Sequence, residues 1–200
     1  GHGELGKGDY AIPFQLLQCI LLTPGTTVSH DALRLLARHG TGLVAVGEDG
    51  VRLYASLPFG PNESARARAH ARKWADPVFR LQAARRMYAW RLGEVFPNAD
   101  LNVLRGIEGA RMKEMYKLMA QKYGVTWDGR KYDRNDPTST NHPNMAINHA
   151  VTAVEATAGV AVAITGAIPQ LGFIHEDAGH AFTLDVTDLY RDAVTLPAAF

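Results

Sequence analysis

The pattern of hydrophobic and polar positions changes its period near residue 58. Before that point, short apolar runs separated by turn residues predict β-strands at residues 14–22, 43–46 and 51–55. Ser29 is a suitable N-cap for a short helix between the first two runs, and Gly40 is a suitable stop for it. The pattern therefore predicts a small β-rich domain with one helix.

The period after this point is helical. A linker is expected at residues 58–62, where two prolines and a glycine interrupt regular structure. Helices are expected from 63 to 91 with a break at Asp76-Pro77, from Asn98 or Asp100 to 123, and from 143 to 165. We thus expect an α+β chain, with a β-rich domain over 1–57 and an all-α domain over 63–200.

The composition excludes a disordered protein but does not distinguish among classes of folded protein. The chain has 200 residues, 46% of them hydrophobic, and a formal net charge of +1, so it can bury a core and is not a disordered protein. The single cysteine, Cys19, lies in an apolar run and is interpreted as a core thiol. The long apolar stretch 151–167 contains Glu155 and many small residues, which favours a buried helix over a membrane span. No signal-peptide pattern is seen at residue 1.

Glu108 is a charged residue on an apolar helix face. On a helix it shares one stripe with four large apolar residues, namely Leu104, Met112, Met115 and Met119. Gly106 and Gly109 flank it, at a cost of roughly 1 kcal/mol each relative to alanine, which suggests close approach by another backbone or a ligand. Pairing of Glu108 with Arg105 or Arg111 is the alternative explanation.

A second group of polar residues follows an apolar segment near the end of the chain. His175 comes directly after Phe173-Ile174, and Asp185 and Asp188 are three residues apart in an apolar run. Histidine and carboxylates together suit an oxygen-preferring divalent ion such as Mg²⁺ or Mn²⁺. The alternative is a hydrogen-bonded core histidine, with the two aspartates favouring a helix start.

The third group is basic. Between residues 66 and 91 the chain has eight arginines and lysines against the single acid Asp76, with aromatic residues between them. Such a cluster attracts phosphate backbones, although a solvated basic face is the simpler reading of any one residue. The candidate DNA contacts in this run and elsewhere are Arg66, Arg68, Arg72, Lys73, Arg85, Arg86, Arg105, Arg111, Arg130, Lys131 and Tyr132.

Several motifs, in this order, resemble a known family. They are Arg105-Gly106-Ile107-Glu108-Gly109-Ala110-Arg111, the segment 123–133 (YGVTWDGRKYD), Gly172-Phe173-Ile174-His175 and Leu184-Asp185-Val186-Thr187-Asp188-Leu189. Together they resemble the CRISPR-associated adaptation integrase, the first Cas protein, and most closely its version in type I, subtype E systems. Segments 22–30 and 46–55 extend the resemblance into the first domain.

The resemblance implies a fold and an activity. The family combines a β-sandwich-like domain with a helical domain, and its metal site would map to Glu108, His175 and Asp188, supported by Asp185. The implied activity is metal-dependent DNA cleavage and joining of the 3′ ends of a short duplex to the CRISPR repeat, with Mg²⁺ or Mn²⁺. The implied partners are double-stranded DNA, a second copy in a homodimer and a small ferredoxin-like CRISPR protein, in the prokaryotic cytoplasm and not at a membrane.

The resemblance also assigns Tyr132 to the DNA end and the arginine run to the DNA path. The first domain looks abbreviated against the family, which also continues beyond the position of Phe200. Two other functions remain open from the sequence: a DNA-clamping subunit without catalysis, and a metal hydrolase acting on small molecules. The second of these leaves the basic run unexplained.

Overall fold

The computed structural model describes residues 13, 16–17, 19–47, 53–56, 64–131 and 141–200. Three strands and one helix come first, and the rest of the described chain is helical. In chain order the elements are β1 (Cys19–Leu22), α1 (His30–His39), β2 (Gly42–Val46), β3 (Leu53–Ser56), α2 (Ala65–Ala75), α3 (Pro77–Leu92), α4 (Leu101–Tyr123), α5 (His142–Thr165), α6 (Ala181–Leu189), the π-helix η3 (Arg191–Thr195) and α7 (Leu196–Ala199).

The strands form one sheet in the order β1-β2-β3. β1 and β2 are parallel, with Cys19 opposite Gly42, and β3 is antiparallel to β2. A parallel pair needs a crossover, which α1 provides. As expected, Ser29 caps α1 by accepting the amide N–H of Ala32 at 3.2 Å. Each of the three predicted segments contains a strand in its described part, with β2 beginning at Gly42 and β3 ending at Ser56, each one residue beyond the prediction. The described strands make a single layer rather than a sandwich.

The expected helix ends are confirmed because their causes are local. Asp76 ends α2 and caps α3, its Oδ1 accepting the N–H groups of Val78 and Phe79 at 2.9 and 3.2 Å. Asp100 caps α4 by accepting the N–H of Val103 at 2.9 Å. Asn141 does the same for α5 through the N–H of Asn144 at 3.2 Å.

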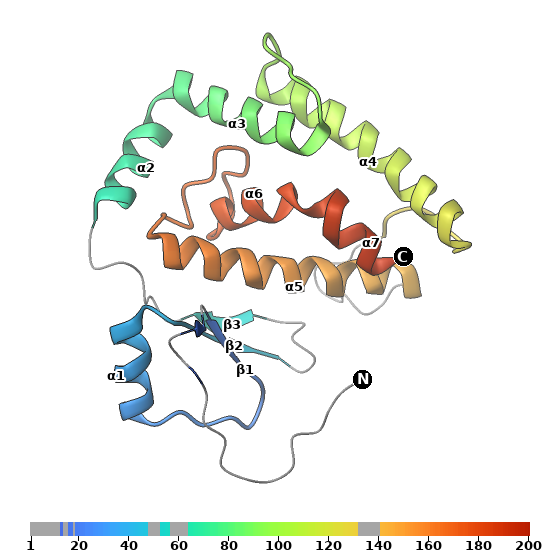
Figure 1. The fold of residues 1–200 in the computed structure, drawn as a ribbon. Helices are drawn as coiled ribbons and strands as arrows, with labels where there is room; N and C mark the ends of the chain where they lie inside the picture. Colours follow the sequence, from blue (N-terminus) through green and yellow to red (C-terminus); the bar gives the residue numbers. More distant parts are fainter. Residues whose placement is uncertain (1–12, 14–15, 18, 48–52, 57–63, 132–140) are drawn as a thin grey trace.

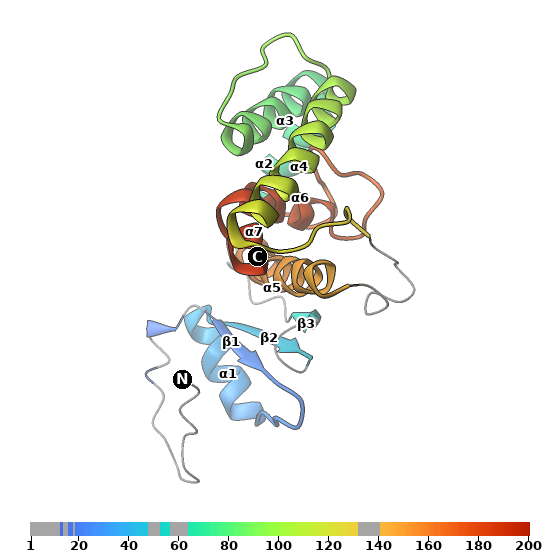
Figure 2. The ribbon, with the colours of Figure 1, turned by 90° about the vertical axis from the view of Figure 1, so that its right-hand side faces the viewer.

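Helix α5 separates two parts of the molecule. The sheet packs on one side of it, and α6 lies on the other side, beneath an arch made by α2, α3 and α4 (Figure 1). In the perpendicular view the sheet again lies on the opposite side of α5 from α6 (Figure 2). Val44 and Val46 of β2 pack with Val160 of α5, so the sheet shares its core with a helix from the second half of the chain.

α5 is also the one helix, among the described residues, that is long and apolar enough to cross a membrane by length and composition alone. Its buried residues include Ile147, Ala156 and Val162. It contacts β2, β3, α6 and α7, but only 28% of its most apolar window is buried, so the prediction of a buried helix is met in part. The predicted linker at 58–62 lies outside the described residues, and the division into two domains stays a prediction.

Two further cores join the helices of the arch to the end of the chain. Met112, Tyr116 and Met119 of α4 pack with Ile147 of α5 and Leu196 of α7. The other core holds Ala84 and Tyr88 of α3, Leu104 of α4, and Ile174 from the segment between α5 and α6. These contacts fix α3, α4 and the 172–176 segment relative to one another.

Candidate metal centre and nucleic-acid interface

Glu108 lies on α4 with its side chain 18% exposed. The hydroxyl of Tyr88 donates to its Oε2 at 2.9 Å, and Arg91 donates from Nη1 to its Oε1. Burial, together with the charge of Glu108, raises the pKa of Tyr88, so that hydroxyl stays protonated. The alternative pairing of Glu108 with Arg105 or Arg111 is wrong, because Arg105 donates to a main-chain carbonyl and Arg111 to a carbonyl and to Glu94.

Asp185 organises the turn that carries His175. The carboxylate is fully buried, and its Oδ2 accepts the N–H groups of Phe173 and Ile174 at 2.5 and 3.1 Å. Its Oδ1 accepts the N–H of His175 at 3.0 Å and faces Nδ1 of the same residue at 2.7 Å. This hydrogen bond is the main reason that the pKa of His175 is raised, and it leaves Nε2 to face the site.

Asp188 lies one helical turn after Asp185 and meets the other residues of the site. Its Oδ2 is 3.8 Å from Nε2 of His175 and 3.6 Å from Nη1 of Arg91, while Nη2 of Arg191 pairs with its Oδ1 at 2.8 Å. The alternative reading of Asp185 and Asp188 as helix-start residues is wrong, since α6 begins at Ala181 and Asp185 caps the preceding turn.

The structure thus brings Glu108, His175 and Asp188 around one point, and Arg91 is there as well. In the described part of the chain no group of three or more His, Cys, Asp and Glu side chains stands in an arrangement ready to hold a metal ion. Two carboxylates and a neutral imidazole nitrogen nevertheless suit Mg²⁺ or Mn²⁺. The guanidinium of Arg91 lies between the carboxylates of Glu108 and Asp188, so this position attracts positive charge. The chemistry of the residues therefore fits a metal cation.

Tyr88, Arg91 and Arg191 also belong to the site, although the sequence pattern does not assign them to it. Tyr88 and Arg91 are three residues apart on α3, and Arg191 is three residues after Asp188, so each pair shares a helix face. The spacing of Arg191 from Asp188 is enough to indicate their pairing, but only the packing of α3 against α4 and α6 shows which carboxylates Tyr88 and Arg91 meet.

Helix α2 holds the same turn from the other side. His70 is buried and hydrogen-bonds the carbonyl of Leu171 through Nε2 at 2.8 Å, while Ile168 donates its N–H to Nδ1 at 3.1 Å. Trp74 donates from Nε1 to the carbonyl of Gly172 at 2.8 Å. These two side chains, four residues apart, clamp the segment that leads to His175, a role that the sequence pattern does not indicate either.

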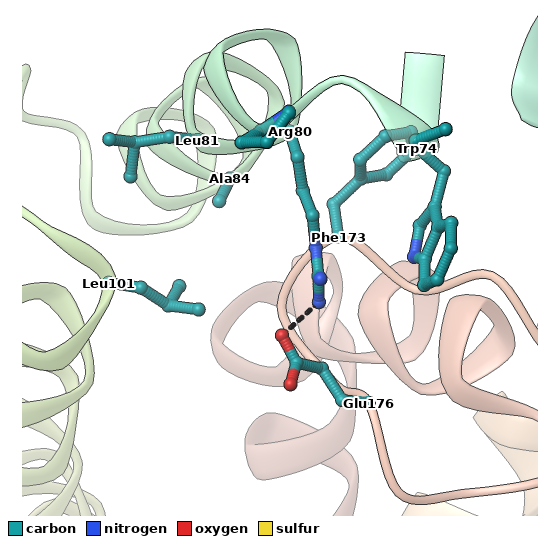
Figure 3. A pocket seen from close by; sticks show the side chains of 9 residues that line it. Trp74, Arg80, Leu81, Ala84, Leu101, Phe173 and Glu176 are labelled. Carbon is teal, nitrogen blue, oxygen red and sulfur yellow. Dashed lines mark hydrogen bonds and ion pairs between the residues drawn. The ribbon is translucent and has the colours of Figure 1, made fainter. Parts of the chain in front are cut away.

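A pocket of about 380 Å³ adjoins this turn (Figure 3). Its walls include Trp74, Leu81, Leu101 and Phe173. Arg80 crosses it, pairs with Glu176 and lies 5.3 Å from the Trp74 ring centre. None of the predicted metal ligands lines this pocket.

The basic residues fall into two groups. Arg66, Arg68, Arg72 and Arg86 are exposed and have no ion-pair partner among the described residues, and Lys73 lies over the Phe79 ring at 5.0 Å. The others serve the fold: Arg85 donates to the carbonyl of Ala99 at 2.8 Å, Arg105 to that of Ile174 at 2.6 Å, and Arg111 to that of Leu92 at 3.0 Å.

The loop after α4 is tied to the start of α5. Arg130 donates to the side-chain oxygens of Asn144 and Asn148 at 3.0 and 2.6 Å, and Lys131 donates its backbone N–H to Asn144 at 2.9 Å. Tyr132 lies outside the described residues.

For the two glycines beside Glu108, close approach of another backbone or of a ligand was expected, and the structure tests the first of these. A Cβ atom added at Gly106 or Gly109 would meet no atom of another segment within 4 Å. The expected close approach of another backbone therefore does not occur within the described chain.

Comparison with known proteins assigns the chain to a family. Residues 91–195, which include Glu108, His175 and Asp188, match the family described as CRISPR associated protein Cas1. The chain belongs to the Cas1 family. The CRISPR-associated endonuclease Cas1 of Escherichia coli (strain K12) is 40% identical over 94% of this chain and 62% of its own length. A Cas1 endonuclease of Methanospirillum hungatei JF-1 is 38% identical over the whole chain and 71% of its own length.

A solved Cas1 structure has the same fold. The crystal structure of the TtCas1-DNA complex matches with a TM-score of 0.75 at 35% identity, over 94% of this chain and 70% of that one. The family resemblance drawn from the motifs is therefore confirmed. The chain spans about 62% of the length of the E. coli Cas1 that it matches.

Proposed function

We propose that this chain carries the catalytic part of a Cas1 integrase, a metal-dependent endonuclease that joins short DNA duplexes to a CRISPR repeat. The observation that carries the proposal is the convergence of Glu108, His175 and Asp188 from three separate segments. The names of the relatives support an endonuclease, and the TtCas1-DNA complex supports DNA as the substrate.

Each residue has a distinct role in this proposal. Glu108, Asp188 and Nε2 of His175 would hold one Mg²⁺ or Mn²⁺ ion. Asp185 is a positioning residue, because it fixes the imidazole through Nδ1. When bound, the ion supplies Lewis acidity at the scissile phosphate and favours ionisation of the attacking 3′-hydroxyl.

The exposed cations of α2 and α3 supply the DNA surface. Arg66, Arg68, Arg72, Lys73 and Arg86 offset phosphate charge along the duplex. We further propose a homodimer, assembly with a small ferredoxin-like CRISPR partner, and a cytoplasmic location. Tyr132 remains a proposed contact to the DNA end.

The test is an integration assay with the full chain, a labelled duplex, a repeat substrate and Mn²⁺ or Mg²⁺, with and without the small partner. Glu108→Gln, His175→Ala and Asp188→Asn should each reduce joining by at least about a hundredfold, because losing one ligand weakens ion binding and transition-state stabilisation. Undiminished joining by these variants would refute the assignment.

Two other residues of the chain serve as matched controls. Glu114→Gln on α4 and His149→Ala on α5 change exposed residues of the same types and should leave joining intact. The arginines that already neutralise both carboxylates keep a second function open, a DNA-clamping subunit without catalysis. Duplex binding by the wild-type chain, with no joining under any metal and partner condition, would favour it.

A further inference from the structure

Arg91 is the most deeply buried basic side chain of the site. Its side chain is 3% exposed, and its Nη1 contacts Oε1 of Glu108 and lies 3.6 Å from Oδ2 of Asp188. Burial alone would lower the pKa of Arg91, but Asp188 and Glu108 more than offset it and the pKa is raised. The guanidinium is therefore held there as a cation.

Arg91 contacts the one oxygen of Glu108 and the one oxygen of Asp188 that accept no other hydrogen bond within the described residues and could therefore bind an ion. The second oxygen of Glu108 is taken by the Tyr88 hydroxyl, and the second oxygen of Asp188 is taken by Arg191. Nε2 of His175 faces the same Oδ2 of Asp188. An ion bound at about 2.0–2.1 Å from both oxygens leaves no room for a nitrogen between them.

We infer that Arg91 and a divalent ion are mutually exclusive occupants of the Glu108–Asp188 pair. The guanidinium neutralises the carboxylates in the metal-free protein and withdraws when the ion binds. This inference rests on the proposed function, since it concerns the same ion.

Asp192 is the group that can receive Arg91 when it withdraws. Its Oδ1 is buried without a hydrogen-bond partner among the described residues, as are Nε and Nη2 of Arg91. The two side chains interact electrostatically but are not paired in this state. Asp192 follows Asp188 by four residues, so the second position is close to the first. A guanidinium moving between these carboxylates would satisfy polar atoms that are otherwise unpaired in the protein interior.

The test measures Mn²⁺ affinity of the full chain by calorimetry and by electron paramagnetic resonance of free Mn²⁺. Arg91→Met should bind Mn²⁺ more tightly than wild type, by about 5- to 150-fold, the usual range of coupling between two competing ligands. Arg34→Met, an exposed arginine on α1, is the matched control and should bind like wild type. Equal or weaker binding by Arg91→Met would overturn the inference.

The melting temperature of Arg91→Met and the Mn²⁺ affinity of a second variant provide two further tests. Arg91→Met should melt at a lower temperature than wild type in chelator, because two carboxylates lose their counter-ion, and should gain more from Mn²⁺. If Arg91→Met does not fold, Asp192→Asn replaces it: losing the receiving carboxylate should weaken Mn²⁺ binding severalfold, and unchanged binding would count against the inference.

Failure of the inference and failure of the proposed function give different results. If wild type binds Mn²⁺ and joins DNA while Arg91→Met has unchanged affinity, the function stands and the exchange is wrong. If neither protein binds Mn²⁺ while both remain folded, the metal centre itself is wrong and the exchange falls with it.

Discussion

The carboxylates of the site differ in how many of their oxygens already accept hydrogen bonds. This number distinguishes a positioning residue from a candidate metal ligand. Both oxygens of Asp185 accept hydrogen bonds from the 173–175 turn, so it has no oxygen to offer an ion. Glu108 and Asp188 each keep one oxygen facing the common point. This difference makes Asp185 a positioning residue and the other two ligand candidates, although all three are carboxylates.

Gly172 is where this turn packs most tightly. A Cβ there would lie 2.8 Å from Cβ of Ala181 and 2.9 Å from its carbonyl carbon, and closer still to the carbonyl oxygen of His175. We expect Gly172→Ala to lower the free energy of unfolding by about 1–3 kcal/mol, because backbone must move to relieve the overlap. Urea denaturation measures this change, and an integration assay should show a loss of joining since His175 is displaced.

Gly109→Ala is the matched control. Gly109 is exposed in the middle of α4, and a Cβ there meets nothing within 4 Å. Alanine should raise the free energy of unfolding by about 0.5–1 kcal/mol, since it reduces the freedom of the unfolded chain. Equal effects at the two glycines would contradict the packing described for Gly172.

At the scale of single residues, the sequence predicted on which helix face a side chain lies better than it predicted which side chains it contacts. The periodic stripe correctly placed Glu108 on the inner face of α4, because helical spacing is a local property. Its partners, Tyr88 and Arg91, lie on another helix and depend on the packing of α3 against α4. The same holds for Asp185, whose bonds reach ten to twelve residues back along the chain.

Among the elements, α2 controls the site through two side chains that touch none of the proposed ligands. His70 must be neutral to accept the N–H of Ile168 at Nδ1 while donating from Nε2 to Leu171. Stacking on Phe173 and an edge contact with Phe182 complete its surroundings. Protonation of Nδ1 would direct two N–H groups at each other and open the clamp.

Stability should therefore depend on pH through His70. Burial lowers the pKa of His70 below its ordinary value of 6.5, so the unfolded chain binds the proton more readily than the folded one. The contribution of His70 is fully present above pH 6.5 and is lost as the pH falls from there through the folded pKa. Free energies of unfolding measured across this range should fall faster for wild type than for His70→Gln, which does not titrate.

The control is His149→Gln, which replaces an exposed histidine on α5. The free energy of unfolding of this variant should depend on pH as that of wild type does. A pH dependence in His70→Gln identical to that of wild type would contradict the clamp.

The distance along the chain between two contacting residues decides whether the sequence could predict their contact. The caps of α1, α3 and α4 could be read from the sequence because they involve neighbours within three residues. The Asn141 cap of α5 is equally local but was not predicted, since only a start at residue 143 was expected. The clamp formed by His70 and Trp74 could not, since it joins residues about a hundred positions apart. Local chemistry therefore predicts where a helix begins, and tertiary packing decides what its side chains hold.

In the whole molecule, the predicted basic run divides by function. The sequence indicated a run of cations from 66 to 91 but could not show which of them the fold uses internally. Arg85 holds the carbonyl of Ala99 and Arg91 fills the site, whereas Arg66, Arg68 and Arg72 remain exposed. Only the exposed members are available to DNA phosphates.

This division predicts a difference in salt dependence. The double variant Arg66→Ala/Arg68→Ala should weaken duplex binding and reduce the slope of log affinity against log salt by about 0.9 for each phosphate that the protein no longer neutralises. Fluorescence anisotropy with a labelled duplex over a salt series measures this slope. Arg85→Ala should instead lower the free energy of unfolding, because its partly buried hydrogen bond is removed, and leave the slope near that of wild type. A larger reduction of the slope for Arg85→Ala than for the double variant would mean that α3, rather than α2, contacts the phosphates.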